Sequence, residues 1–358
     1  MSILVTGGAG FIGANLVTRW LRSHSEDIVN LDKLTYAGNL ASLVEVAGDP
    51  NHKFVHGDIC DANLLGDLLR SHRIRAVVHL AAESHVDRSI HGPENFIRTN
   101  VTGTFRLLEA ARGYWETLAG RDREEFRFIN VSTDEVFGSL DADDPPFTER
   151  SLYQPNSPYS ASKAAADHLA RSYFHTYGVP IITTHCSNNY GPRQFPEKLI
   201  PVLLLNGMRG ESLPVYGDGG NIRDWLYVDD HCDALRRILE DGVPGETYNI
   251  GGNCEMANID LVRSVCELLD EVRANSASVP HVDLVEFVSD RPGHDRRYAI
   301  DAAKIRKHLD WQPRENFESG LRKTVKWYLE NGEWIAQVTS GEYRNWMETN
   351  YGLRAKTS

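Results

Sequence analysis

The sequence has no C-x-x-C pair, no long apolar run and no excess of positive charge. Its five cysteines lie at positions 60, 186, 232, 254 and 266. This spacing disfavours zinc and redox motifs and predicts reduced thiols in a cytoplasmic protein. No apolar stretch approaches the ~20 residues of a membrane span, and the first residues lack the design of a signal peptide. We therefore expect a cytoplasmic protein with no metal site.

Acidic residues outnumber basic ones, 50 to 38 in 358 residues, which gives a formal net charge of −12. Such a charge disfavours nucleic acid and anionic membranes as main partners. An anionic small molecule would need a local group of Arg and Lys side chains. The composition is that of an ordinary soluble globular protein, and the length suits two domains or one large one.

Short apolar runs alternate with helical patterns over the first half of the chain. Strands are expected at ILVT, IVNL, KFVH, AVVHLA, FRFINVS and PIITTHC, and helices between them at FIGANLVTRWLRSH, ANLLGDLLRSH and TGTFRLLEAAR. This alternation predicts an α/β fold with a doubly wound parallel sheet and a smaller α/β lobe. The rhythm loosens after residue 187 and resumes once, at WLYV, DDHCDALRRILE and ETYNIGG. Segment 224–252 is therefore expected to return to the first sheet.

Three glycines follow the first expected strand and lead into the first expected helix. Gly7, Gly10 and Gly13 form a G-x-x-G-x-x-G pattern, which allows a tight turn and a pyrophosphate at the helix N-terminus. Asp32 ends the second strand, where a carboxylate binds ribose hydroxyls and repels a 2′-phosphate. The pattern predicts a Rossmann-type domain that prefers NAD to NADP. The alternative is that Asp32 is a solvated loop residue.

Further residues at the strand ends are expected to lie along the same cofactor. Asp58 would meet the adenine edge, and the segment LAAES would lie beside the cofactor path. The expected cofactor-binding residues are Gly7, Gly10, Phe11, Ile12, Gly13, Asp32, Lys33, Leu34, Thr35, Asp58, Ile59, Leu80, Ala81, Ala82, Ser84, Thr99, Tyr159, Lys163 and Asn189.

A tyrosine and a lysine lie four residues apart at the head of an Ala-rich helix. Tyr159 and Lys163, in YSASK, share one helical face. A nearby ammonium lowers the pKa of a tyrosine from about 10, so that its phenolate becomes a usable base. The spacing alone is common by chance. It becomes informative after the glycine pattern and the ST dipeptide at a strand end.

The segment STDEVFG places Thr133, Asp134 and Glu135 where a buried strand should end. Neighbours on a regular strand point to opposite faces, so both acids can face one site only if the chain turns there. Two close carboxylates resist ionising together, which predicts one acid beside one base. The alternative is that they are surface-loop acids or a helix cap.

These motifs resemble the extended short-chain dehydrogenase/reductase family over nearly the whole chain, through TGGAGFIG, YSASK, NNYGPR and RDWLYVDD. Within it, STDEVFG, AAESHVDRSI and RPGHDRRY are similar to the dTDP-glucose 4,6-dehydratases, which commonly have tyrosine at the position of Phe137. The resemblance implies an NAD-binding domain over 1–187, joined by 224–252. It implies a nucleotide-sugar lobe over 188–223 and 253–358, and a homodimer paired through helices near 95–112 and 159–177.

The resemblance also implies a reaction, in which dTDP-glucose becomes dTDP-4-keto-6-deoxyglucose and water. Tyr159 would deprotonate the 4-hydroxyl while NAD oxidises C4, and Thr133 would hold that oxygen. Glu135 would remove the C5 proton, Asp134 would protonate the departing 6-hydroxyl, and NADH would return its hydride to C6. The alternatives are a UDP-glucose or GDP-mannose 4,6-dehydratase, a nucleotide-sugar epimerase, or a non-catalytic regulatory protein that binds NAD.

A nucleotide diphosphate needs cations and donors, which the second lobe supplies as Lys198, Arg223 and Arg291. The segment PVYGDG would flank the base, and Ser84 and His85 would lie nearer the hexose. The expected catalytic residues are Thr133, Asp134, Glu135, Tyr159 and Lys163. The expected substrate-binding residues are Ser84, His85, Thr133, Asn188, Glu197, Lys198, Leu199, Pro214, Tyr216, Arg223, Asn258, Asp290, Arg291, His294 and Tyr298.

Overall fold

The computed structural model describes residues 1–272 and 280–339. A seven-stranded parallel sheet has the order β3-β2-β1-β4-β5-β6-β10. Its strands are β1 (Ser2–Thr6), β2 (Ile28–Asp32), β3 (His52–His56), β4 (Ile74–His79), β5 (Arg127–Thr133), β6 (Ile181–Cys186) and β10 (Thr247–Ile250). This order confirms the predicted α/β, Rossmann-type fold. Residues 273–279 and 340–358 of the expected second lobe lie outside the described residues.

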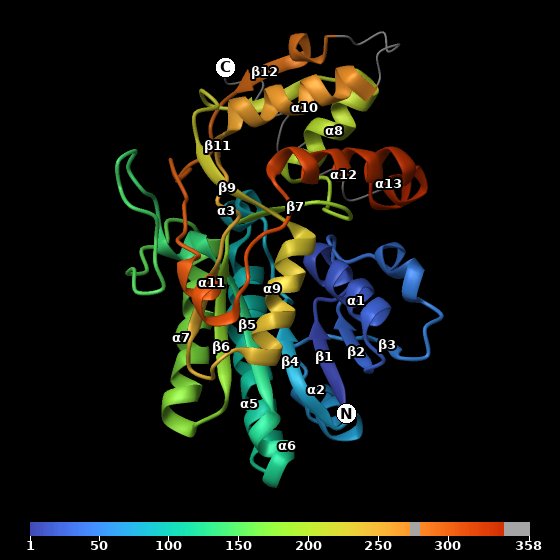
Figure 1. Ribbon diagram of the computed structural model, residues 1–358, viewed down its shortest axis with the longest axis vertical. Coiled ribbons are helices and arrows are strands. Elements are labelled where there is room, and N and C mark those ends of the chain that lie inside the picture. The colour runs from blue at the N-terminus through green and yellow to red at the C-terminus, as the bar shows by residue number, and fades with distance from the viewer. Residues whose placement is uncertain (273–279, 340–358) are drawn as a thin grey trace.

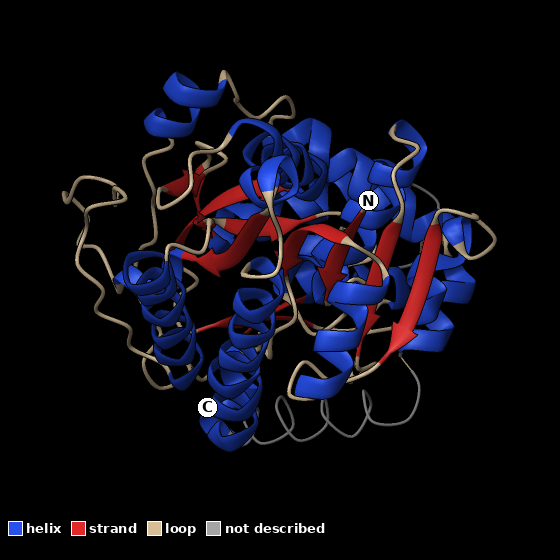
Figure 2. Ribbon diagram, turned by 90° about the horizontal axis from the view of Figure 1, so that it is seen from below, coloured by secondary structure: helices blue, strands red, loops and turns tan. Residues whose placement is uncertain are grey.

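Helices cover both faces of this sheet (Figures 1 and 2). One face packs against α1 (Phe11–Ser23), α9 (Val228–Asp241) and α11 (Ala303–Leu309). The other packs against α2 (Ala62–Ser71), α5 (Thr104–Trp115) and α7 (Pro158–Tyr177). Most of the strands are buried on both faces, so their residues do not alternate between apolar and exposed polar, as in other parallel sheets. Shorter elements join them: η1 (Leu40–Val46), α3 (Val86–His91), α4 (Pro93–Phe96), the π-helical turn η2 (Ile97–Gly103), α6 (Gly120–Glu125) and the 3₁₀ turn η3 (Asp134–Phe137).

A second lobe lies beyond the carboxyl ends of the sheet strands, at the top of Figure 1. It contains a three-stranded sheet of β7 (Asn188–Tyr190), β9 (Ile222–Tyr227) and β11 (Glu255–Ala257), and a pair of β8 (Leu213–Tyr216) with β12 (Val285–Val288). Its helices are α8 (Leu199–Arg209), α10 (Asn258–Val272), the 3₁₀ turn η4 (His281–Leu284), α12 (Phe317–Glu330) and α13 (Gly332–Val338). A separate apolar core holds them together.

Segment 224–252 returns to the first sheet only in part. Strand β10 pairs with β6, and α9 packs beside α1, but β9 lies between β7 and β11 in the second lobe. The carboxylate of Asp224 explains the place of β9. It accepts the amide hydrogens of Gly252 at 2.9 Å and Cys254 at 2.6 Å, which ties β9 to the turn before β11. The expected strand WLYV therefore belongs to the smaller sheet.

The strand order reverses between β1 and β4, because β1 leads to β2 on one side and β4 leads to β5 on the other. In open α/β sheets ligands bind beyond the carboxyl ends of the strands at such a switch point. The second lobe stands over the same edge (Figure 1). Within residues 1–272 and 280–339, no helix has both the length and the apolar character needed to cross a membrane.

Helix α7 begins with a reciprocal cap that depends on two serines. The Ser157 hydroxyl accepts the amide hydrogen of Ser160 at 3.0 Å, and the Ser160 hydroxyl accepts that of Ser157 at 3.1 Å. Pro158 occupies the first helical position, where its missing N–H costs nothing. This cap fixes where α7 starts, at Pro158, one residue before Tyr159.

We predict that Ser157→Ala lowers the free energy of unfolding by about 1 kcal/mol, the usual loss for an N-cap hydroxyl. Urea unfolding followed by circular dichroism measures it. Ser172→Ala, on the exposed side of the same helix, is the control and should cost less than about 0.5 kcal/mol. Equal losses in the two variants would contradict a capping role.

Candidate active site

One cleft runs along the carboxyl edge of the sheet, from the turn between β1 and α1 to the end of β5 and the head of α7. All five expected catalytic residues line it. Every expected cofactor-binding residue lines it as well, except Leu34. Leu34 has a φ of +54°, and its side chain packs against the sheet core instead. Its place in the cofactor site therefore stays a prediction, and the left-handed turn at this residue is not visible in the sequence.

The glycine turn leaves room for a ligand at only one of its positions. A Cβ at Gly7, whose φ is +75°, would lie 2.6 Å from the amide nitrogen of Ala81. One at Gly13 would lie 2.2 Å from the carbonyl oxygen of Gly7, so the turn itself excludes side chains there. Gly10 is less crowded, since a Cβ there would lie 3.3 Å from the carbonyl oxygen of Gly7, and it precedes α1 without any side-chain cap. The free amide hydrogens of the first turn suit a pyrophosphate.

Asp32 is a buried residue, 8% exposed, and not a solvated loop aspartate. Its carboxylate accepts the amide hydrogens of Ala9 at 2.9 Å and Leu34 at 2.8 Å. Burial raises the pKa of Asp32, while these amide hydrogens act against the rise. Each oxygen keeps a further lone pair, so the carboxylate at the cleft can also accept two ribose hydroxyls.

The chain turns at the end of β5, which brings the two acids into one site. Strand β5 ends at Thr133, and η3 begins at Asp134. The Thr133 hydroxyl oxygen accepts the amide hydrogen of Glu135 at 3.3 Å and donates to Asp134 Oδ1 at 3.3 Å. Both acids line the cleft, and Asp134 is only 1% exposed. They are therefore not surface-loop acids, and Thr133 is the residue that caps the turn.

The surroundings shift the pKa values of the Asp134 and Glu135 carboxyl groups to different extents. Burial, and next the charge of Glu135, raise the pKa of Asp134 well above its ordinary value. Its Oδ2 is buried without a hydrogen-bond partner in the described part of the chain. Burial also raises the pKa of Glu135, but Arg291 and Lys198 oppose that rise. These surroundings favour the protonated form more strongly for Asp134 than for Glu135.

Tyr159 and Lys163 lie together in the cleft, but the electrostatics differ from the sequence expectation. Burial, and then the charge of Glu135, raise the pKa of Tyr159 well above its ordinary value. Lys163 Nζ donates to the carbonyl oxygen of Val131 at 2.8 Å. The predicted lowering of the tyrosine pKa by Lys163 is therefore wrong for the protein alone. A hydrogen bond with Thr133 opposes the rise.

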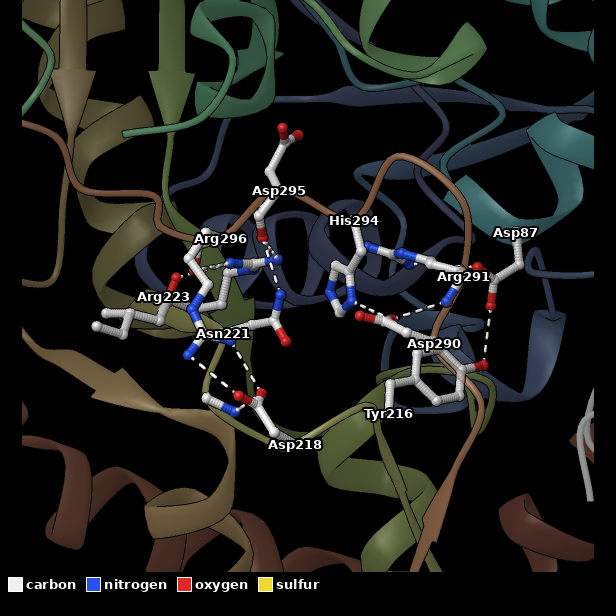
Figure 3. A network of polar contacts seen from close by, with 12 residues as sticks. Asp87, Tyr216, Asp218, Asn221, Arg223, Asp290, Arg291, His294, Asp295 and Arg296 are labelled. Carbon is white, nitrogen blue, oxygen red and sulfur yellow. Dashed lines mark hydrogen bonds and ion pairs between the residues drawn. The ribbon is translucent and has the colours of Figure 1, made fainter. Parts of the chain in front are cut away.

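Several substrate residues expected from the sequence form a second polar group, in the smaller lobe (Figure 3). Arg291 pairs with the Asp87 carboxylate of α3 at 3.3 Å, and the Tyr216 hydroxyl donates to the same carboxylate at 3.0 Å. Arg223 donates to the carbonyl oxygen of Asp295 at 2.8 Å. Its guanidinium lies 4.3 Å from the centre of the Tyr298 ring.

Other expected substrate residues divide between the cleft and its surroundings. Ser84, Asn188, Glu197 and Lys198 line the cleft with Thr133. The rest do not line it: His85, Leu199, Pro214, Tyr216, Arg223, Asn258, Asp290, Arg291, His294 and Tyr298. His85 is buried at the start of α3, with Nε2 3.3 Å from the Glu197 carbonyl oxygen. Leu199 begins α8, Asn258 begins α10 and Pro214 lies in β8.

The cleft also contains residues that the sequence reading missed, among them Glu83, Cys186, Ser187, Gln194 and Phe195. Each adjoins a motif that was recognised, in LAAES, PIITTHC or NNYGPRQFPEK. Strand-end position was the signal available for Glu83, Cys186 and Ser187. No group of three metal-ligating side chains occurs in residues 1–272 or 280–339.

A comparison with protein families agrees with this geometry. A model of the family described as GDP-mannose 4,6 dehydratase matches residues 4–324. The chain belongs to the GDP-mannose 4,6-dehydratase family. The match spans both lobes, from β1 to α12.

Individual relatives are similar to this chain over nearly their whole length. The dTDP-glucose 4,6-dehydratase of Neisseria meningitidis serogroup B is 57% identical over 344 residues, which cover 96% of this chain and 97% of the relative. That of Shigella flexneri is 54% identical over 359 residues, covering 98% and 99%. The structure of dTDP-glucose 4,6-dehydratase from Streptomyces venezuelae with NAD bound has a TM-score of 0.84 and 46% identity, covering 94% of this chain and all of that one. These similarities confirm the resemblance inferred from the motifs.

We predict that the stability of Asp134→Asn relative to the wild type increases as pH rises from about 4 to 8. Unfolded aspartate titrates near 3.9, whereas the folded pKa of Asp134 is raised well above that. Between the two values the folded state holds a proton that the unfolded state has lost, so wild-type stability falls with rising pH. The amide does not titrate, so the variant escapes this loss.

Urea unfolding at several pH values measures the difference between variant and wild type. Asp143→Asn, in an exposed loop, is the matched control and should show a constant, small difference. A constant difference for Asp134→Asn as well would mean that Asp134 is ionised in the folded protein.

Proposed function

We propose that the protein is an NAD-dependent dTDP-glucose 4,6-dehydratase, which forms dTDP-4-keto-6-deoxyglucose and water. The observation that carries this proposal is the pair of the buried Asp134 and the neighbouring, partly exposed Glu135 in the same cleft as Tyr159 and Lys163. Oxidation at C4 needs one base, whereas elimination of water across C5 and C6 also needs a base for C5 and an acid for the leaving hydroxyl. The names of the relatives from Neisseria meningitidis and Shigella flexneri support the same activity.

The cleft has the donors and acceptors that NAD requires. The amide hydrogens at the start of α1, beside Gly10, would bind the pyrophosphate, and Asp32 would accept the ribose hydroxyls. Bound NAD would take a hydride from C4 of the hexose and return it to C6, so that it leaves the cycle unchanged. The solved relative from Streptomyces venezuelae contains NAD.

In this proposal Tyr159 accepts the proton of the 4-hydroxyl, and Thr133 hydrogen-bonds the same oxygen. Because the pKa of Tyr159 is raised in the protein alone, the phenolate would need positive charge from bound ligands and from Lys163. The positively charged nicotinamide ring of oxidised NAD can supply part of it. Tyr159 would therefore become a competent base only once the cofactor is in place.

The 4-keto group makes the C5 hydrogen acidic, and the two carboxyl groups act on the resulting intermediate. Glu135 would remove that proton, helped by Arg291 and Lys198, which hold its pKa down. Asp134, kept protonated by burial, would donate its proton to the 6-hydroxyl as the C6–O bond breaks. The proton on Glu135 can then return to C5 when C6 is reduced.

The two lobes would divide the binding work. Residues 1–187 with α9 and β10 would hold the cofactor, and the remainder would hold the nucleotide. Lys198, Arg223 and Arg291 would meet the diphosphate in an otherwise acidic chain. We infer a cytoplasmic enzyme whose substrate is a small nucleotide sugar.

Competing functions differ in what the site would need. A UDP-glucose or GDP-mannose 4,6-dehydratase would share the chemistry and differ in the base pocket. An epimerase has no elimination step and so no use for a buried acid beside a base. A non-catalytic NAD-binding protein has no need of Tyr159, Lys163 and the acid pair together. The relatives at 54–57% identity favour dTDP-glucose.

We predict three separable defects when dTDP-glucose is mixed with the variants. Tyr159→Phe should form no NADH, because C4 oxidation cannot start. Glu135→Gln should oxidise C4 and then stall with NADH bound, because the C5 proton cannot leave. Asp134→Asn should oxidise C4 but lose water slowly, since an amide is a poor acid. Each should cost about 10²–10⁴ in turnover.

Single-turnover absorbance of NADH, with deuterium followed from C4 to C6, measures these steps. The wild type is also compared on dTDP-glucose, UDP-glucose and GDP-mannose. Dehydration by Glu135→Gln at the wild-type rate would remove the acid pair from the mechanism. Turnover of UDP-glucose or GDP-mannose in preference to dTDP-glucose would overturn the substrate assignment.

We also propose a homodimer in which α5 and α7 of two copies form a four-helix bundle. Each helix carries an exposed aromatic side chain, Phe105 in α5 and Tyr177 in α7, and Ile97 is exposed in the turn that precedes α5. Single exposed apolar residues are common on monomers, so the proposal rests mainly on the resemblance, and these side chains are available for contact with a second copy. Light scattering at micromolar concentration should give about twice the mass of one chain, and the mass of a single chain would refute this.

A further inference from the structure

A buried carboxylate lies directly behind the catalytic strand, outside the cleft. Asp167 is on α7, one turn after Lys163, and is 3% exposed. Asn130 Nδ2 donates to Oδ1 at 2.8 Å. The hydroxyls of Ser132 and Tyr153 donate to Oδ2 at 2.7 and 3.2 Å. A charged group buried so deeply is retained only where hydrogen bonds and opposite charge compensate for lost hydration.

Two of these donors belong to β5, which ends in the catalytic residues. Ser132 directly precedes Thr133, and Asn130 lies two residues earlier on the same strand. The carboxylate therefore connects the helix that carries Tyr159 to the strand that carries Asp134 and Glu135. The relative placement of the base for C4 and the acid–base pair for C5 and C6 depends on this connection.

Asp167 is also the anion that most strongly favours the charged form of the Lys163 ammonium. Burial lowers the pKa of Lys163, and among the neighbouring charges Asp167 opposes this most. The other titratable groups that face Lys163 are Tyr159, His79 of β4 and Cys186 of β6. Burial lowers the pKa of His79 to about 3 and raises that of Cys186 to about 12, so both are neutral at pH 7. Tyr159 is neutral there for the same reason.

The far side of the carboxylate is closed by a histidine and a tyrosine. His185 Nε2 lies 3.4 Å from Asp167 Oδ2 and 2.7 Å from the Tyr153 hydroxyl oxygen. Phe137 packs against the edge of the His185 ring. This surround keeps water away from Asp167, which strengthens its interaction with Lys163.

We propose that Asp167 is a positioning residue that fastens β5 to α7 and serves as the anionic partner of the Lys163 ammonium. This inference rests on the proposed function, in which Lys163 must stay charged to promote ionisation of Tyr159. Asp167 touches neither substrate nor cofactor. It acts through Lys163 and through the end of β5.

The test compares Asp167→Asn with Tyr153→Phe and Ser132→Ala. The first removes the charge and keeps the shape, whereas each of the others removes one hydrogen bond and keeps the charge. The pH dependence of kcat/KM for dTDP-glucose and of the Kd for NAD is measured in each. In Asp167→Asn the alkaline limb should move to lower pH by about 1 unit or more, because the ammonium loses its partner. The two controls should lower activity without moving the limb.

An unmoved limb in Asp167→Asn, with a loss like that of Tyr153→Phe, would overturn the proposal and leave Asp167 as a simple structural residue. Circular dichroism checks folding. If Asp167→Asn does not fold, Asp167→Glu decides, because it keeps the anion. A wild-type limb in Asp167→Glu supports the proposal, and a shifted limb or an unfolded Asp167→Glu overturns it. Inactivity of the wild type on dTDP-glucose would refute the proposed function alone, since NAD binding still reports on Lys163.

Discussion

Two carboxyl groups that are neighbours in the chain and share a buried site cannot both be ionised at low cost. Asp134 and Glu135 are placed in this way by the 3₁₀ turn that follows β5. The neighbouring residues of the cleft and of the second lobe decide which of the two carboxyl groups is more readily protonated. Asp134 lies in the drier position beside Thr133, and the cations of the second lobe act on Glu135. The difference between the proposed acid and the proposed base thus comes from the surroundings, because the two side chains differ by only one methylene.

The fold and the first half of the site could be predicted from the sequence because their signals are local. The glycine turn, the strand-end Asp32 and the Tyr159–Lys163 spacing are each short-range patterns within one βα unit. There the hydrophobic periodicity and the turn residues determine the geometry. The direction of the Leu34 side chain could not be predicted, because it packs against the core after a left-handed φ at a residue that is not glycine. The pairing of β9 in the smaller sheet could not be predicted, because its partners, β7 and β11, are distant in the sequence.

The electrostatics could not be predicted because they depend on residues that only the fold brings together. Lys163 was expected to lower the pKa of Tyr159, yet its Nζ donates to Val131, and burial and Glu135 dominate around the tyrosine. Arg291 was expected to be available to a diphosphate. In the structure it pairs with Asp87, which lies on α3 of the other lobe. A binding diphosphate would therefore compete with a carboxylate that already bridges the two lobes.

The return of β10 to the sheet has a consequence for how the chain is made. Strand β6 sits beside the catalytic strand β5, and its outer edge is covered only by β10, which lies more than 60 residues further along. During synthesis the backbone groups of β6 stay exposed as an open strand edge while the first part of the second lobe emerges. The seven-stranded sheet can therefore be completed only after residue 250 has been synthesised, when β7, α8, β8 and β9 of the second lobe have already been made.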